Sequence, residues 1–192
     1  MTVSIQKKQI AKAAFQVFGG KPSVFKYWDN QQKNDVDILS CPDRPQAGVT
    51  SYSTIGLSDA SIGLTSDEVP LRVEIVGACG SAFAGYANVL ATCAFDVMEA
   101  NAECRPGAVL RDAVAVNVPD VEMKHVWLVP PFLWEEELKT LEFPSMKVAW
   151  LLAVPISEAE RAFAEEQGAE ALESLFEEKQ IDLFDLRRAS VL

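Results

Sequence analysis

The segment from Lys147 to Ile156 constrains the fold more than any other part of the chain. Almost all of its residues are apolar, which is typical of a β-strand that is covered on both faces of its sheet. Because side chains alternate along a strand, Trp150 and Leu152 should point to one face and Leu151 to the other. We therefore expect a central strand in which all three side chains are buried.

A pair of helices is predicted directly after this strand. Pro155 should end the strand, and Ser157 is placed to cap the N-terminus of a helix. Glu160, three residues further on, completes the pattern of a capping box. Gly168 should end this helix, and a second helix is predicted from about residue 169 to residue 179.

Two further helices and several strands are predicted in the rest of the chain. An apolar stripe predicts a helix from about Ser4 to Phe18, ended by the glycines that follow it. A second, largely buried helix is predicted from Ser81 to about Glu103, where apolar residues recur at helical spacing. Composition and alternation predict strands at residues 23–28, residues 36–41, the GVTSYSTIGLSD segment from Gly48, residues 71–76, and the HVWLVPPFLW segment from His125.

The predicted fold class is α+β, a mixed α/β sandwich in which helices pack on the faces of a central, mostly antiparallel or mixed sheet. Strands outnumber helices, and short connections favour antiparallel neighbours. Residues 1–192 are expected to form a single domain, since domains typically have about 100–200 residues. A chain of this length buries about 70% of its unfolded surface, so its stability should need neither disulfide bonds nor metals.

The composition and charge of the chain indicate which partners it can bind and in which cellular compartment it is expected. The formal net charge of −11 makes nucleic acid an unfavourable partner. Four cysteines without a CxxC pair, together with a single histidine, predict no metal site, and no cofactor is expected. The N-terminus lacks the pattern of a signal peptide, and no apolar run reaches the roughly 18 residues of a membrane span. We therefore expect a cytoplasmic protein with free thiols and no membrane partner.

No catalytic residue is predicted. A serine or cysteine triad would need His125, which opens an apolar strand where a packed or edge imidazole is the common case. The motifs GxGxxG, P-loop and HExxH are absent. The GACGSAFAG segment from Gly77 resembles a phosphate-binding loop, but its spacing fits neither nucleotide fingerprint. A tight turn that allows close packing of a helix on the sheet is the favoured interpretation.

A group of polar side chains suggests a small site on the sheet. Arg72 and Glu74 share one face of their strand, and Tyr52, Thr54 and Ser58 are expected on one face of the preceding strand. One interpretation is a salt-bridged pair on the outer sheet face, which contributes little if exposed. The other is a functional polar patch formed by the five residues together.

The region from residue 157 to residue 185 is strongly acidic. It holds ten acidic residues against two basic ones, a local charge of −8, whereas residues 1–33 hold six lysines against one aspartate. A charge run is usually a solvated face that keeps a protein soluble. The alternative is a surface that steers a cationic protein partner, formed by Glu158, Glu165, Glu166, Glu170 and Glu173.

Five segments, in this order and spacing, resemble the suppressor-of-fused domain family: GVTSYSTIGLSD, LRVEI, HVWLVPPFLW, VAWLLAVPISEAERAFAEEQG and DLFDLRRASV. The resemblance extends from about Tyr27 to Val191. It implies a compact α/β sandwich without catalytic residues or a cofactor. Animal members add a C-terminal domain and grip an extended peptide of a transcription factor. Short members resemble bacterial proteins for which an antitoxin or immunity role is inferred.

The expected function is therefore non-catalytic protein binding. A short bacterial member of this kind would mask a protein partner, such as a basic toxin, through its acidic surface or a free sheet edge. The alternative function is a small-molecule binder or an unrecognised enzyme that uses the face of Tyr52, Arg72 and Glu74.

Overall fold

A mixed β-sheet organises the chain, whose computed structural model describes residues 3–100, 102–134 and 136–192. Within these ranges the sheet has nine strands in the order β1-β2-β3-β5-β9-β7-β6, while β4 pairs with β5 and β8 pairs with β9. The bounds are β1 Ser23–Trp28, β2 Asp35–Pro42, β3 Val49–Ile55, β4 Leu64–Ser66, β5 Val69–Gly80, β6 Val109–Leu110, β7 His125–Val129, β8 Leu141–Phe143 and β9 Met146–Ile156. The predicted α+β class with a mixed sheet is confirmed.

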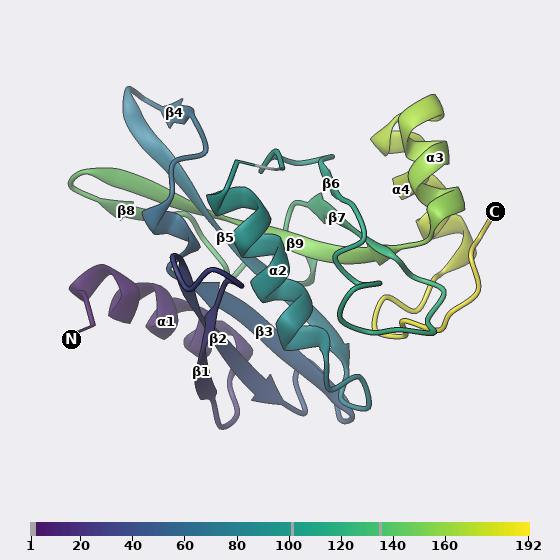
Figure 1. Cartoon of the computed structure of the whole chain (residues 1–192), viewed down its shortest axis with the longest axis horizontal. Helices are drawn as coiled ribbons and strands as arrows, with labels where there is room; N and C mark the ends of the chain where they lie inside the picture. Colours follow the sequence, from purple (N-terminus) through teal and green to yellow (C-terminus); the bar gives the residue numbers. More distant parts are fainter. Residues whose placement is uncertain (1–2, 101, 135) are drawn as a thin grey trace.

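The two longest strands, β5 and β9, lie side by side in the middle of the sheet (Figure 1). They are parallel, with Leu71 opposite Lys147 and Val76 opposite Leu152. All other strand pairs in the described ranges are antiparallel. The apolar run in β9 follows from this position, because a strand with neighbours on both sides and cores on both faces has no exposed side.

Apolar cores cover both faces of the sheet. The helix α2, Tyr86–Met98, lies across one face (Figure 1), and Leu151 packs into the core beneath it. The helix α1, Ile5–Phe18, belongs to the second core, which contains Trp150 and Leu152. All three side chains of β9 are buried, so their predicted burial and alternation are confirmed.

The predicted helix pair follows β9 and lies beyond the end of the sheet (Figure 1). The helix α3 spans Glu158–Gln167, and α4 spans Ala169–Lys179. The capping box is present: the Ser157 hydroxyl accepts from the backbone N–H of Glu160 at 3.1 Å, and the Glu160 carboxylate accepts from the backbone N–H of Ser157 at 2.9 Å. Gly168 links the helices with φ of 94°, a backbone region that favours glycine.

The predicted bounds of α2 are wrong at both ends: the helix begins at Tyr86 and ends at Met98, and residue 101 of the predicted helix lies outside the described residues. Residues 81–85 form turns instead of helix, in which Phe83 N–H donates to the carbonyl of Gly80 at 2.9 Å. Small residues bring the chain close to its neighbours here: a Cβ on Gly77 would lie 2.6 Å from the Tyr86 hydroxyl, and one on Gly85 would lie 2.8 Å from a backbone carbonyl. The GACGSAFAG segment therefore consists of the end of β5 followed by tight turns at residues 81–85, and its small residues allow the close packing favoured above.

Several short elements were not predicted from the sequence. They are β4, β6 and β8 and the 3₁₀ helices η1, Leu57–Asp59, and η2, Phe132–Trp134. Elements of two or three residues are too short to show a hydrophobic period. Among the described helices, none combines the length and apolar character that a membrane crossing requires.

Candidate protein-binding surface

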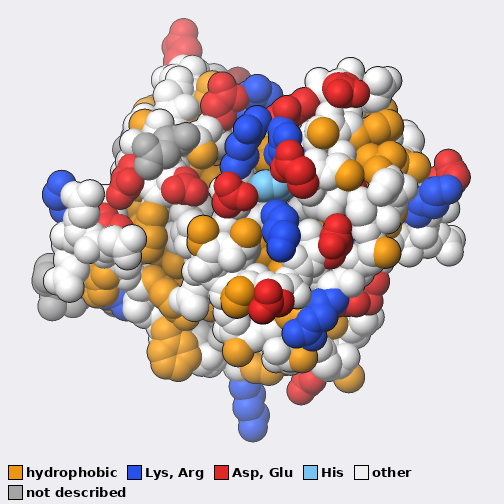
Figure 2. Space-filling view, turned by 45° about the vertical axis from the view of Figure 1, so that its right-hand side comes forward, with side chains coloured by type: hydrophobic (Ala, Val, Ile, Leu, Met, Phe, Trp, Pro, Cys, Tyr) orange, Lys and Arg blue, Asp and Glu red, His pale blue; other side chains and the backbone are white. Residues whose placement is uncertain are grey.

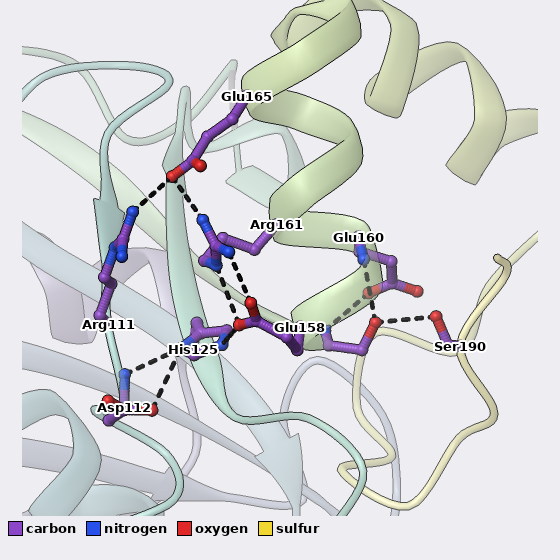
Figure 3. A network of polar contacts seen from close by, with 9 residues as sticks. Arg111, Asp112, His125, Glu158, Glu160, Arg161, Glu165 and Ser190 are labelled. Atoms are coloured by element: carbon purple, nitrogen blue, oxygen red, sulfur yellow. Dashed lines mark hydrogen bonds and ion pairs between the residues drawn. The ribbon is translucent and has the colours of Figure 1, made fainter.

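His125, the first residue of β7, lies against the N-terminus of α3 (Figure 3). The backbone N–H of Asp112 donates to Nδ1 at 2.9 Å, so the proton of the neutral ring resides on Nε2. Nε2 then donates to the Glu158 carboxylate at 2.7 Å. The residue is 4% exposed. Both ring nitrogens are engaged, which is the packed imidazole expected from the sequence.

Arg161 connects this histidine to a wider ion-pair network (Figure 3). Its guanidinium donates to both oxygens of Glu158, at 2.9 and 2.5 Å, and lies 2.5 Å from Glu165. Glu165 also accepts from Arg111 at 2.8 Å. Hydrogen bonds from Arg161, and then from His125, lower the pKa of Glu158 to about 2. Arg161 likewise lowers the pKa of Glu165, so both carboxylates are held charged and neutralised by neighbours.

Ion pairs within the protein therefore neutralise only part of the predicted acidic surface. Figure 2 shows the single histidine at the centre of one face, surrounded by both acidic and basic side chains. Glu158 and Glu165 belong to the network there. Glu166, Glu170 and Glu173 are also exposed, but their side chains form no ion pair with any other described residue. Of the five predicted residues, these three carry charge that remains available to a partner.

A second network, next to the first, is buried. Glu160 is 0% exposed and Arg188 is 9% exposed. Their side chains form a bidentate pair with hydrogen bonds of 2.6 and 2.8 Å. The Glu160 carboxylate also accepts from the backbone N–H of Val191 at 3.2 Å, and the guanidinium of Arg188 donates to the carbonyl of Pro155 at 3.2 Å. This network fixes the C-terminal segment against the start of α3.

This pairing was not predicted from the sequence, in which Glu160 is one of the ten acidic residues of the region from residue 157 to residue 185. Arg188 lies 28 residues after Glu160 in the sequence, so no local sequence pattern predicts the contact. The partners of Arg161 were detectable, because Glu158 and Glu165 stand at i−3 and i+4 from it on one helix face.

The five residues of the predicted polar patch do not come together. Glu74 is completely buried, where its carboxylate accepts from the hydroxyls of Thr54 and Ser58 at 2.6 and 2.7 Å. The backbone N–H of Gly56 donates to it at 2.8 Å. Burial raises the pKa of Glu74, while these hydrogen bonds oppose the shift. Ser58 belongs to η1 and not to the preceding strand, so that part of the prediction is wrong.

Tyr52 and Arg72 lie outside this cluster. Tyr52 packs against Tyr86 in the core beneath α2, with ring centroids 5.4 Å apart. Arg72 is partly exposed and forms no salt bridge with Glu74 or any other described residue. The predicted Arg72–Glu74 pair on an outer sheet face is therefore wrong. The reason is that η1 folds over Glu74 and its hydroxyl and amide groups replace water around the carboxylate.

The described residues indicate neither a metal site nor a reactive thiol. Among the described residues, no cluster of three histidine, cysteine, aspartate or glutamate side chains could hold a metal ion. The four cysteines, Cys41, Cys79, Cys93 and Cys104, are free and buried. Burial raises the pKa of Cys79 and of Cys104 to about 12, which keeps these thiols protonated and weakly nucleophilic.

Residues 32–189 match the sequence model of the suppressor of fused protein family. The chain belongs to this family. The match spans most of the stretch from Tyr27 to Val191 in which the sequence resembles the family, so that recognition is confirmed. Over all 192 residues, this family member is 50% identical to Immunity protein YqcF of Bacillus subtilis strain 168, and the match covers 100% of both chains.

Solved structures of suppressor of fused proteins share the fold. A homologue from Neisseria gonorrhoeae FA 1090 superposes with a TM-score of 0.70 at 18% sequence identity, covering 98% of each chain. A chain of the Sufu–Fu complex superposes with a TM-score of 0.65 at 13% identity, covering 97% of this family member and 92% of that chain. Suppressor of Fused from Drosophila is matched over 42% of its own chain, with a TM-score of 0.54 and 13% identity.

Proposed function

We propose that this protein is a non-catalytic immunity protein that binds a protein toxin in the cytoplasm and masks it. The observation that carries the proposal is the 50% identity with Immunity protein YqcF over the full length of both chains. The likeness to a chain of the Sufu–Fu complex agrees with a fold that binds other proteins.

The acidic surface on α3 and α4 is the proposed contact region. Its residues are Glu158, Glu165, Glu166, Glu170 and Glu173. A single-sign patch raises the encounter rate with a partner of opposite charge, and a basic toxin is such a partner. Glu158 and Glu165 are neutralised within the protein, so we assign the steering to Glu166, Glu170 and Glu173.

Two features of the structure favour binding over catalysis. The His125 ring has both nitrogens hydrogen-bonded within the protein, which leaves neither free to accept a substrate proton. The Glu74 carboxylate is sequestered by donors from Thr54, Gly56 and Ser58. A small-molecule or enzymatic site at Tyr52, Arg72 and Glu74 remains a prediction, and we favour a structural role for Glu74.

Co-expression tests the proposed function. The product of each gene adjacent to the one that encodes this protein is expressed in a bacterial host with and without the protein. We expect one product to arrest growth alone and to be tolerated when the protein is present. We also expect the two to co-purify in a complex. A host that dies equally in both cases for every adjacent product, with no complex recovered, would contradict the proposal.

A further inference from the structure

An open hollow of 270 Å³ lies between β7 and α4. Its lining is mainly apolar, and the apolar residues come from β7, η2, β9, α4 and the segment that follows α4: Trp127, Val129, Phe132, Val154, Phe176, Ile181 and Leu183. The ring of Trp127 meets that of Phe176 edge-on, with centroids 6.0 Å apart. Phe132, on η2, remains 47% exposed, so an aromatic ring at this site is available to a second molecule.

Trp127, one of the lining residues, has a buried hydrogen-bond donor without an acceptor. Trp127 is 4% exposed, and its indole N–H has no acceptor among the described residues. Leaving a buried donor unpaired lowers the stability of a fold, and such groups are rare in folded proteins. A carbonyl or hydroxyl group brought by a bound chain would remove this cost after a small adjustment of the lining. This donor is a second feature of the lining, besides its apolar character, and an acceptor from a bound chain would satisfy it.

Two carboxylates stand on the rim of the hollow. Glu173 and Glu177 both line it and are exposed. They are four residues apart on α4, a spacing at which like charges destabilise a helix. Neither forms an ion pair with another described residue. A cation placed between them would relieve the repulsion and pair with both.

We propose that this hollow holds a large apolar side chain of the protein partner, with a lysine or arginine beside it that pairs with Glu173 and Glu177. A hollow of this size is smaller than the roughly 300–1,000 Å³ of a small-molecule site, and it suits one anchoring side chain. Buried apolar anchors dominate the energy of many interfaces. The inference rests on the proposed function and names the chemistry of the partner segment at that surface.

A second copy of this chain fits the hollow less well. Its strand β1 does expose Phe25 next to Lys26. Lys26, however, is already paired with Asp35 and Asp37, and it would have to break these contacts to reach a new carboxylate. We therefore assign the hollow to a different protein with an unpaired basic residue.

A synthetic peptide tests this chemistry directly. The probe is a pentapeptide, Gly-Lys-Phe-Lys-Gly, blocked at both ends, and the controls replace both lysines by glutamate or the phenylalanine by serine. Binding is followed through the indole ¹H–¹⁵N signals of the full chain, with the Trp127 signal assigned from Trp127→Phe. We expect the probe at millimolar concentration to shift the Trp127 signal and both controls to leave it unchanged. An unchanged Trp127 signal with the probe, or an equal shift with the controls, overturns the proposal.

Variants on the rim supply a second measurement. Phe132→Ala and Glu177→Gln should each weaken probe binding about two- to fivefold, the range of an exposed contact or ion pair. The matched controls are Val116→Ala, at another exposed apolar residue, and Glu178→Gln, on the same helix but outside the hollow. Controls that weaken binding as much as the rim variants would overturn the inference.

Failure of this inference is distinguishable from failure of the proposed function. If the protein still protects a host from a toxin while Phe132→Ala and Glu177→Gln keep wild-type affinity for that toxin, the proposed function stands and the hollow is not the anchor site. Light scattering adds a further outcome: a dimer of the full chain that Phe132→Ala converts to a monomer would assign the hollow to a second copy and overturn the proposal.

Discussion

Arg188 and Glu160 form a bidentate ion pair, with hydrogen bonds of 2.6 and 2.8 Å, at a place where water is almost wholly excluded. Glu160 is at the same time the glutamate of the α3 capping box. The start of α3, the end of β9 at Pro155 and the C-terminal segment therefore meet at this ion pair. Stability of the helix pair should depend on this carboxylate more than on any exposed charge.

Replacing Arg188 by alanine should lower the free energy of unfolding by about 3–5 kcal/mol, because it leaves the Glu160 carboxylate buried without its partner. Urea denaturation followed by circular dichroism measures the loss. Arg187→Ala is the matched control, since Arg187 is exposed, and it should change the free energy by less than about 1 kcal/mol. If Arg188→Ala also lowers the free energy of unfolding by less than about 1 kcal/mol, the Arg188–Glu160 pair makes no net contribution to stability.

Glu74→Gln should be tolerated and should change the pH dependence of stability. The amide oxygen can keep the hydrogen bonds from Gly56 and Ser58, while the amide nitrogen can donate to the Thr54 hydroxyl oxygen. We expect a change of less than about 1.5 kcal/mol at low pH, the value of one hydrogen bond.

The sign of the pH effect follows from the raised pKa of Glu74. Above the ordinary pKa of a glutamate, the folded state holds a proton there that the unfolded state has released. The Glu74 contribution to stability is therefore full below that ordinary pKa, and it decreases as the pH rises through the folded pKa. Urea midpoints of the wild type and of Glu74→Gln, compared between about pH 4 and pH 8, should converge at the acidic end. If the urea midpoints of the two proteins differ by the same amount at every pH, the raised pKa of Glu74 in the folded state is contradicted.

Leu151→Ala and Leu152→Ala probe the two cores separately, because these neighbours point to opposite faces of β9. Each should lower the free energy of unfolding by about 2–5 kcal/mol. If residues 1–192 form one cooperative domain, as we propose, both variants should still unfold in a single transition whose calorimetric and van't Hoff enthalpies agree. Two separate transitions would refute the single-domain proposal.

Charge reversal at Glu166, Glu170 and Glu173 should slow association with a basic partner and leave the fold intact, since exposed substitutions usually change stability by less than about 0.5 kcal/mol each. Surface plasmon resonance should place the effect in the association rate. The effect should shrink as salt shortens the Debye length from about 10 Å at 0.1 M to about 3 Å at 1 M. Glu122→Lys, an exposed reversal on another segment, is the control. Wild-type association at low salt would leave the acidic surface as a solubility feature.

Local signals account for the elements that the sequence predicted well. The apolar run of β9, the alternation in β5 and the Ser157–Glu160 capping box each lie within a few neighbouring residues, and the structure contains all three. The N-terminal boundary of α2 was predicted wrongly because alanines and glycines allow both helix and turn, and residues 117–118, which lie close to Gly85 in space, are far from it in the sequence.

Buried polar groups could not be predicted in the same way. Glu74 and Glu160 look like surface acids in the sequence, yet the side-chain groups that sequester them lie 16–28 residues away. The same holds for the hollow beside α4, which unites Trp127 with Leu183. Periodicity reports which face of an element is apolar, but it does not report which polar group folds over which carboxylate.

The parallel pairing of β5 with β9 has a consequence for synthesis on the ribosome. The middle of the sheet can form only after residue 147, the partner of residue 71, has been synthesised. At about 5–20 residues per second, synthesis of the chain between these two residues takes roughly 4–15 s. During that interval β5 presents an open edge, the kind of surface at which chains aggregate. We expect nascent chains arrested near residue 130 to be cleaved by protease within β5, whereas the released protein resists. Equal resistance in both would mean that the first half of the sheet is stable on its own.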